Sequence, residues 1–154
     1  MSDNYSLIIK NGSCYINGKL SKVDLGLSGK KIIKIGEIEL NSSKVFDATN
    51  KVILPGIIDT QVHFREPGST DAEDLESGSR AAVLGGVTSL FEMPNTNPPT
   101  ANLVEFEKKL QLARDRMHSN YAFYFGATPE NIDKLSQLKN LKGCCGIKLF
   151  AGSS

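Results

Sequence analysis

Apolar runs alternate with segments of helical periodicity from Val52 to the end of the chain. Such alternation is typical of a parallel sheet covered by helices. The runs predict strands at about 52–60, 88–93, 121–126 and 145–150. The segments between them predict helices at about 70–84 and 102–118 and a third that carries Ile132, Leu135 and Leu138. We therefore expect an α/β fold, and an open four-stranded sheet is possible on this pattern alone.

The first third of the chain has a different pattern, with short β-rich runs from residue 5 to about 51. Two of these runs flank Asn11-Gly12, and Asn-Gly is a strong hairpin signal. A further strand is predicted in KKIIKIGEI. We expect a small, mostly antiparallel β unit at residues 1–51 and a separate α/β domain at residues 52–154.

Composition excludes several classes of protein. The 154 residues carry a net charge of +1 with mixed charges along the chain, so neither a nucleic-acid nor a membrane partner is expected. No run approaches the length of a membrane span, and the N-terminus does not resemble a signal peptide. The three cysteines, without a CxxC pair, argue against a disulfide framework. A cytoplasmic location is expected.

The segment that bears chemistry is LPGIIDTQVHFREPG, residues 54–68, where a strand runs into polar residues. Because residues i and i+2 of a strand point to the same side, Gln61 and His63 project together from the strand end. In a (β/α) architecture the reactive groups lie at that end. The other histidine, His118, is expected near the end of a surface helix, where it has a structural role.

This segment resembles the opening signature of the dihydroorotases, Asp-x-His-x-His, in the amidohydrolase superfamily of metal-dependent hydrolases. Asp59 and His63 match, whereas Gln61 occupies the place of the first histidine. The resemblance implies zinc as the cofactor, with His63 as a ligand. An amide oxygen is a poorer zinc ligand than imidazole, so Gln61 predicts weak binding or none.

Lys148 lies within a short apolar strand, CGIKLF. A buried ammonium group needs a partner, so the residues alone leave two explanations open, an ion pair or an exposed strand end. The resemblance adds a third. In many amidohydrolases the lysine that ends the fourth strand is carboxylated by CO₂ and bridges two metals, which implies that Lys148 is a metal ligand.

Arg65 and Asn95 follow the first and second predicted strands, in HFREPG and MPNTNPPT. A guanidinium group suits a carboxylate, and an amide can both donate and accept. The resemblance implies that both residues contact the carboxylate side of dihydroorotate. The alternatives are that Arg65 pairs with Glu66 or Asp71 and that Asn95 only shapes a turn.

As a whole, the resemblance implies the first four β units of a (β/α)₈ barrel, preceded by part of a small β-sandwich. A complete barrel needs about 250 residues. The implied function is a cyclic amide hydrolase that interconverts dihydroorotate and N-carbamoyl-aspartate in pyrimidine biosynthesis. No catalytic residue is carried over, because the family's later ligands and general base have no position in this chain, and we expect the chain to be inactive alone.

Two other functions stay open. One is a non-catalytic module that binds a partner chain, and the other is an unrelated open α/β binding domain. The expected partners are a small-molecule substrate and either a complementary C-terminal half or a second copy of the chain.

Overall fold

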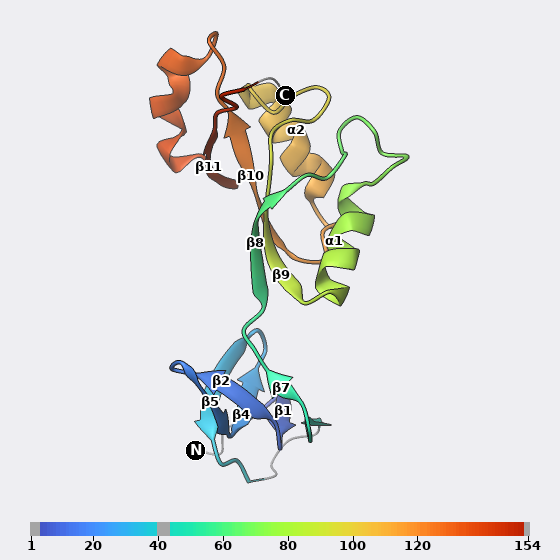
Figure 1. The fold of residues 1–154 in the computed structure, drawn as a ribbon, viewed down its shortest axis with the longest axis vertical. Helices are drawn as coiled ribbons and strands as arrows, with labels where there is room; N and C mark the ends of the chain where they lie inside the picture. The colour runs from blue at the N-terminus through green and yellow to red at the C-terminus, as the bar shows by residue number, and fades with distance from the viewer. Residues whose placement is uncertain (1–3, 40–43, 153–154) are drawn as a thin grey trace. The chain divides into compact units, whose positions relative to one another are not determined.

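The computed structural model describes residues 4–39 and 44–152. Contacts divide the chain into two compact units, Met1–Pro55 and Gly56–Ser154 (Figure 1). Each unit has its own sheets and its own hydrophobic cluster, so the two are described separately.

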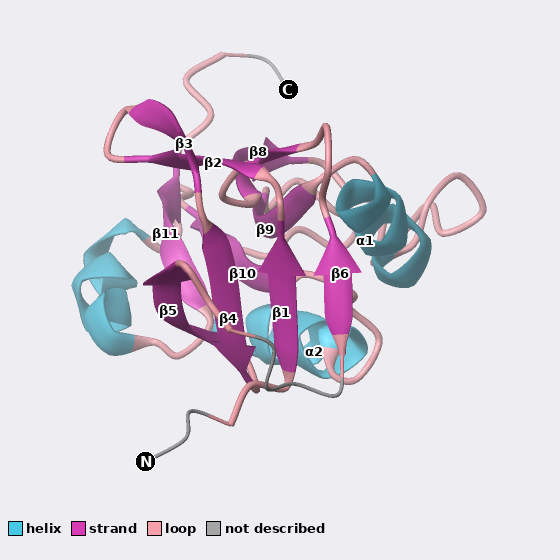
Figure 2. Cartoon of the chain, turned by 90° about the horizontal axis from the view of Figure 1, so that it is seen from below, coloured by secondary structure: helices cyan, strands magenta, loops and turns pink. Residues whose placement is uncertain are grey.

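The first unit contains two small mixed sheets. One has the order β5-β4-β1-β6, whose strands lie side by side in Figure 2, and the other has the order β3-β2-β7. The pairs β1–β4, β4–β5 and β2–β3 are antiparallel, whereas β1–β6 and β2–β7 are parallel. The strands are β1 (Leu7–Lys10), β2 (Ser13–Ile16), β3 (Lys19–Lys22), β4 (Asp24–Ser28), β5 (Lys31–Gly36), β6 (Val45–Asp47) and β7 (Val52–Ile53).

The predicted hairpin at Asn11-Gly12 is wrong, because β1 and β2 belong to different sheets. The hairpin instead joins β2 to β3 through Asn17-Gly18, where both residues have positive φ, 49° and 81°. Such angles fit the two-residue turns that asparagine and glycine favour. At Gly12 a side chain would collide with Ile53, so this glycine allows the chain to pass close to β7 between the two sheets.

The second unit is a parallel four-stranded sheet with the order β11-β10-β9-β8, and it confirms the predicted α/β alternation. Its buried cluster joins Leu90 and Phe123 of the sheet to Leu75, Phe106 and Leu138 of the helices, so all the helices pack on one face. The elements are β8 (Ile57–Val62), α1 (Leu75–Leu84), β9 (Val87–Glu92), α2 (Leu103–Ala113), β10 (Asn120–Gly126), the 3₁₀ helix η1 (Ile132–Asn140) and β11 (Cys144–Lys148).

The first predicted strand, 52–60, is divided into two strands. β7 pairs with β2 in the first unit, and β8 pairs with β9 in the second. Between them lies Leu54-Pro55-Gly56, and proline cannot donate to a strand ladder. The apolar run is exposed rather than buried, since β8 is an edge strand and Ile58 has 60% of its surface accessible.

Helix boundaries also differ from the prediction. α1 begins at Leu75 rather than near residue 70, and the side chain of Asp74 caps it. Asp74 Oδ1 accepts from the backbone N–H of Ser77 at 2.7 Å. α2 ends at Ala113, and Asp115 has a positive φ of 61°. His118 therefore lies in an exposed connection, and it is not at a helix end as expected.

Within the described residues, no helix is both long enough and apolar enough to cross a membrane.

Candidate functional site

The end of β8 presents different residues on its two sides. Val62 and Phe64 contact the hydrophobic cluster under the helices. Because side chains alternate along a strand, Gln61 and His63 lie on the opposite side. A side chain at Gly78 of α1 would come within 2.5 Å of the Phe64 ring, so this glycine allows the strand end and the helix to pack closely.

His63 and Asn95 are in contact, although 32 positions separate them in sequence. His63 Nδ1 lies 2.9 Å from Asn95 Oδ1. With the amide oxygen facing the ring, Nδ1 carries the proton and donates, since an amide oxygen can only accept. The lone pair of His63 is then on Nε2, which remains available to a ligand. Asn95 thus fixes the ring of His63, a role that the sequence did not indicate.

Backbone hydrogen bonds hold the loop that carries Asn95. The N–H of Thr100 donates to the carbonyl of Pro94 at 2.9 Å, and the N–H of Gly126 donates to the carbonyl of Thr100 at 2.8 Å. The N–H of Asn97 donates to the carbonyl of Pro67 at 3.0 Å. The last of these bonds joins the loop after β9 to the loop after β8, and these two loops carry Asn95 and His63.

Arg65 is exposed, and its guanidinium group forms no ion pair with a described residue. The alternative partner, Glu66, is buried and binds Arg116 instead, with N–O distances of 2.8 and 3.0 Å. Hydrogen bonding to Glu66 raises the pKa of Arg116. The backbone N–H of Leu75 also donates to Glu66 at 2.9 Å. Neither Glu66 nor Asp71 neutralises Arg65, so its charge is available to an anionic ligand.

Lys148 ends β11, at the other side of the sheet from β8, so β9 and β10 lie between it and His63. Its side chain is half-buried, with Nζ 5.1 Å from the centroid of the Phe150 ring. Among residues 4–39 and 44–152 no carboxylate lies within 4.0 Å of Nζ, so the ion-pair explanation is not realised. Lys148 and His63 both lie at the carboxyl ends of the parallel strands, but two strands separate them and they are not in contact.

A complete metal site is not formed by the described residues, among which no three His, Cys, Asp or Glu side chains are grouped to hold an ion. His63 contributes one imidazole. Gln61 is exposed, and Asp59 Oδ1 is engaged by the backbone N–H of Gln61 at 2.9 Å. These donors alone do not fit zinc, which takes three or four protein ligands. Zinc binding through His63, Gln61 and Lys148 stays a prediction.

Two buried charged residues near the loop that carries Asn95 were not identified from the sequence. Glu92 ends β9 and Lys109 lies in α2; they form an ion pair in which neither side chain has accessible surface. Burial raises the pKa of Glu92 to about 7, despite the nearby ammonium group, and lowers the pKa of Lys109. The available signal was the helical spacing of Lys109 from Phe106 and Ala113, which places a lysine in the apolar stripe of α2.

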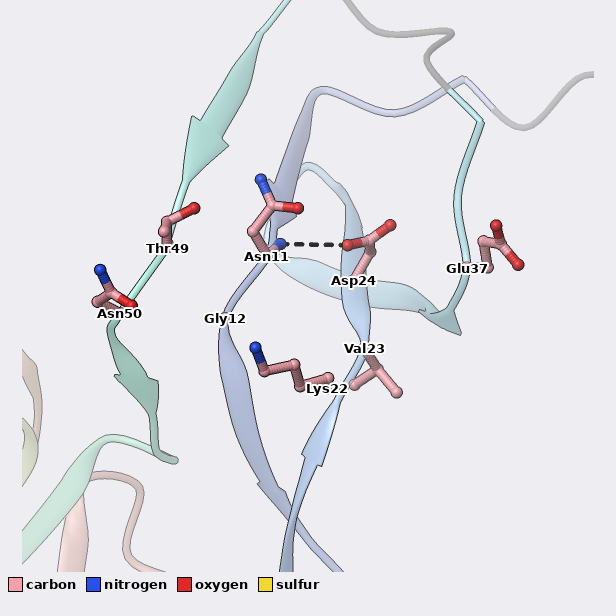
Figure 3. Close-up of a pocket in the computed structure, with 8 residues that line it drawn as sticks. All are labelled: Asn11, Gly12, Lys22, Val23, Asp24, Glu37, Thr49 and Asn50. Atoms are coloured by element: carbon pink, nitrogen blue, oxygen red, sulfur yellow. Dashed lines mark hydrogen bonds between the residues drawn. The ribbon is translucent and has the colours of Figure 1, made fainter.

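The first unit has a pocket of about 480 Å³, lined by residues of segments 11–12, 22–24 and 49–50 and by Glu37 (Figure 3). Its central carboxylate, Asp24, accepts from the backbone N–H groups of Asn11 at 3.4 Å and Ile38 at 3.2 Å. Asp24 also lies 3.5 Å from the ammonium group of Lys10. Asp24 is therefore satisfied by the chain itself, and none of the predicted site residues line this pocket.

Comparison with known proteins identifies the family. The family model described as dihydro-orotase-like matches residues 50–149. The chain belongs to the dihydro-orotase-like family. The matched range contains β8–β11. It also contains all five predicted site residues, which are Gln61, His63, Arg65, Asn95 and Lys148.

Similar proteins include allantoinases from Desulfitobacterium hafniense, 39% identical over 149 residues, and Salmonella choleraesuis, 35% identical over 150 residues. These alignments cover 96% and 97% of the chain and 33% of each relative. The L-hydantoinase (dihydropyrimidinase) of Arthrobacter aurescens has a similar structure, with a TM-score of 0.88 and 27% identity over 97% of the chain and 34% of the hydantoinase.

The chain thus spans about a third of the length of the relatives it matches. Its relatives are cyclic amide hydrolases of the amidohydrolase superfamily, and the expected superfamily is confirmed. The narrower prediction, dihydroorotase, is not supported over allantoinase or hydantoinase.

Proposed function

We propose that the chain supplies the substrate-recognition portion of a hydrolase that opens cyclic ureides. The observation that carries this proposal is the His63–Asn95 contact beyond the end of β8 and within the family match, with the unpaired Arg65 two residues after His63 in sequence. His63 offers a free Nε2, Arg65 a cation and Gln61 an amide.

The substrates that the family and the relatives' names suggest share one chemical unit. Dihydroorotate, hydantoin, dihydropyrimidine and allantoin rings all contain –CO–NH–CO–NH–. Ring opening adds water to an amide carbonyl and breaks its C–N bond, which yields a carboxylate and leaves the nitrogen in a carbamoyl group. The chain's residues would orient this unit, with Asn95 holding the ring of His63 and Arg65 facing an anionic substituent.

Dihydroorotate is the first candidate substrate, because it carries a carboxylate and Arg65 has no carboxylate partner among the described residues. Allantoin, a neutral ring, is the second, because allantoinases reach 35% and 39% identity to the chain. An uncompensated guanidinium group at the site favours the charged ring over the neutral one.

We further propose that β8–β11 are four strands of a (β/α)₈ barrel and that the first unit is part of a β-sandwich. The TM-score of 0.88 to a hydantoinase three times as long supports this. The partner of the chain is then a complementary segment that supplies further strands, metal ligands and the general base.

A chimeric enzyme tests the reaction class. The matched third of the Desulfitobacterium allantoinase is replaced by this chain, and ring opening of allantoin and dihydroorotate is measured. We expect hydrolysis that His63→Ala abolishes. Arg65→Met should reduce kcat/KM for dihydroorotate by about tenfold to a hundredfold, which corresponds to the loss of about 1.5–3 kcal/mol from a charged hydrogen bond. Arg80→Met, a change in an exposed arginine of α1, is the matched control.

The outcomes separate the candidate functions. Equal loss of allantoin and dihydroorotate turnover in Arg65→Met would show that Arg65 does not read a substrate carboxylate, and allantoin would then be the better candidate. A folded chimera that opens neither ring would favour the non-catalytic module that binds a partner chain.

A further inference from the structure

The ion pair between Glu92 and Lys109 is the most deeply buried charged feature among the described residues, since neither side chain has any accessible surface. Burying two charges costs several kcal/mol per ion before their attraction is counted. Apolar residues of similar volume usually serve stability as well or better. The pair therefore calls for a reason beyond filling the core.

Lys109 also donates hydrogen bonds to residues at the two ends of the loop that carries Asn95. Nζ donates to the carbonyl of Met93 at 3.2 Å and to Oγ1 of Thr100 at 3.3 Å, and it lies 5.2 Å from the centroid of the Phe123 ring. Met93 is the first residue after β9. Lys109 thus contacts both ends of the 94–100 segment, and Asn95 lies in this segment.

Thr100 extends the connection further into the loop. Its Oγ1 lies 3.3 Å from Oγ1 of Thr96, whose hydroxyl donates to the carbonyl of Pro98 at 3.0 Å. The backbone of Thr100 is bonded to Pro94 and to Gly126. A continuous set of contacts therefore leads from the ammonium group of Lys109 to the two residues that flank Asn95.

Glu92 holds Lys109 in this position. Its Oε2 forms the ion pair with Lys109, and neither carboxylate oxygen has a further hydrogen-bond partner among the described residues. The carboxylate therefore supplies charge rather than a hydrogen-bond network. An apolar residue at position 109 could fill the space, but it could not donate to Met93 and Thr100.

We propose that Lys109, held by Glu92, is a positioning residue that fixes the 94–100 loop so that Asn95 meets His63. This role rests on the proposed function, in which His63 and Asn95 face the substrate. Lys109 acts through the loop, since its hydrogen bonds end at Met93 and Thr100.

The test reads the geometry of His63 directly, by NMR of the imidazole nitrogens at a single pH above 7, where Glu92 is ionised. The chain has two histidines, so His118, whose Nε2 lies 3.8 Å from Glu76, is an internal reference. In the wild-type chain His63 should show a protonated, hydrogen-bonded Nδ1. In Lys109→Met that Nδ1–H signal should be lost while the signals of His118 stay unchanged. Lys108→Met is the matched control, because Lys108 directly precedes Lys109 in α2, is exposed and pairs with Glu105.

A double variant separates positioning from stability. Glu92→Leu with Lys109→Met removes both charges, so its unfolding midpoint should return to that of the wild type, whereas the Nδ1–H signal of His63 should stay absent. Should Lys109→Met fail to fold, Thr100→Val keeps the ion pair and removes one contact of the loop, and the same signal should weaken.

A double variant that is as stable as the wild type and keeps the Nδ1–H signal of His63 would overturn the proposal. Absence of this Nδ1–H signal from the wild-type chain would also overturn it. This experiment measures no turnover, so a negative result would reject the role of Lys109 without rejecting the proposed ring-opening reaction. That reaction is tested by the chimera assay.

Discussion

His63 keeps one ring nitrogen for a ligand because Asn95 engages the other. Gln61 shares the side of β8 on which His63 lies and is exposed. A pair of side chains at positions i and i+2 could bind one ion together if both were good ligands. The amide of Gln61 supplies only a neutral oxygen, so His63 is the only nitrogen ligand of this pair.

Replacing Gln61 by histidine should therefore strengthen zinc binding. We expect the affinity of Gln61→His to exceed that of the wild type by about tenfold or more, roughly 1.4 kcal/mol or above. Zinc titration against a competing chelator measures this difference. Gln61→Ala is the control, because it removes the amide without adding an imidazole. Equal affinities in the wild type and Gln61→His would remove position 61 from any metal site.

The buried Glu92 should make stability depend on pH. Burial raises its pKa from 4.5 to about 7, so the folded chain keeps a proton that the unfolded chain releases. The stability that the protonated carboxyl group contributes is complete below pH 4.5 and is lost as the pH rises through 7. Urea unfolding followed by circular dichroism, at one protein concentration, should show the wild type losing stability relative to Glu92→Gln across this range. A pH-independent difference would contradict the account.

At single positions, sequence reasoning located His63, Arg65 and Asn95 at strand ends, because a polar residue directly after an apolar run is visible in the sequence. It could not find the contact of Asn95 with His63, which depends on the pairing of β8 with β9. It also missed Lys109, because a lysine in an apolar stripe is normally assigned to the helix edge, and its partner Glu92 is 17 positions away.

At the scale of elements, α1 approaches β8 closely because of Gly78. A methyl group there would come within 2.5 Å of the Phe64 ring, which is tighter than packing allows. Phe64 directly follows His63, so this packing also sets the position of the strand end. The capping of α1 by Asp74 fixes where the helix starts.

We expect Gly78→Ala to destabilise the chain by about 1–3 kcal/mol, the usual cost of overpacking, although alanine favours helix by about 1 kcal/mol. Gly152→Ala, where nothing lies within 4 Å, is the matched control and should be neutral. Chemical unfolding of both variants provides the measurement. A Gly78→Ala variant that is more stable than the wild type would mean that helix propensity outweighs this contact.

Element order was predictable where apolar runs were separated by clear stops, as for β9, β10 and β11. Pairing was not predictable in the first unit. Asn11-Gly12 and Asn17-Gly18 are equivalent turn signals, and only the position of β7 beside β2 decides that the second forms the hairpin. The division of residues 52–60 into β7 and β8 similarly reflects membership of two units.

At the scale of the whole molecule, the second unit has two open sheet edges. β8 and β11 each have one neighbouring strand, and Ile57, Ile58 and Ile147 are about half exposed or more. Unpaired strand edges with apolar side chains favour pairing with another chain.

The chain should therefore self-associate at low micromolar concentration. Sedimentation velocity measures this, and Ile58→Lys, which places a charge on the β8 edge, should shift the distribution toward monomer. Lys30→Ala in the first unit is the control. A single compact monomer with cooperative unfolding would argue that the chain is a self-contained domain.

We propose that the chain carries one portion of a cyclic ureide hydrolase site and that a complementary segment completes this site. The direct measurement is ring opening of dihydroorotate and allantoin, with zinc present, by the chain alone and after mixing with the remaining two-thirds of the Desulfitobacterium allantoinase. We predict no detectable turnover by the chain alone, turnover after mixing, and its loss when the chain carries His63→Ala. Turnover by the chain alone at a rate near that of a complete enzyme would contradict the claim.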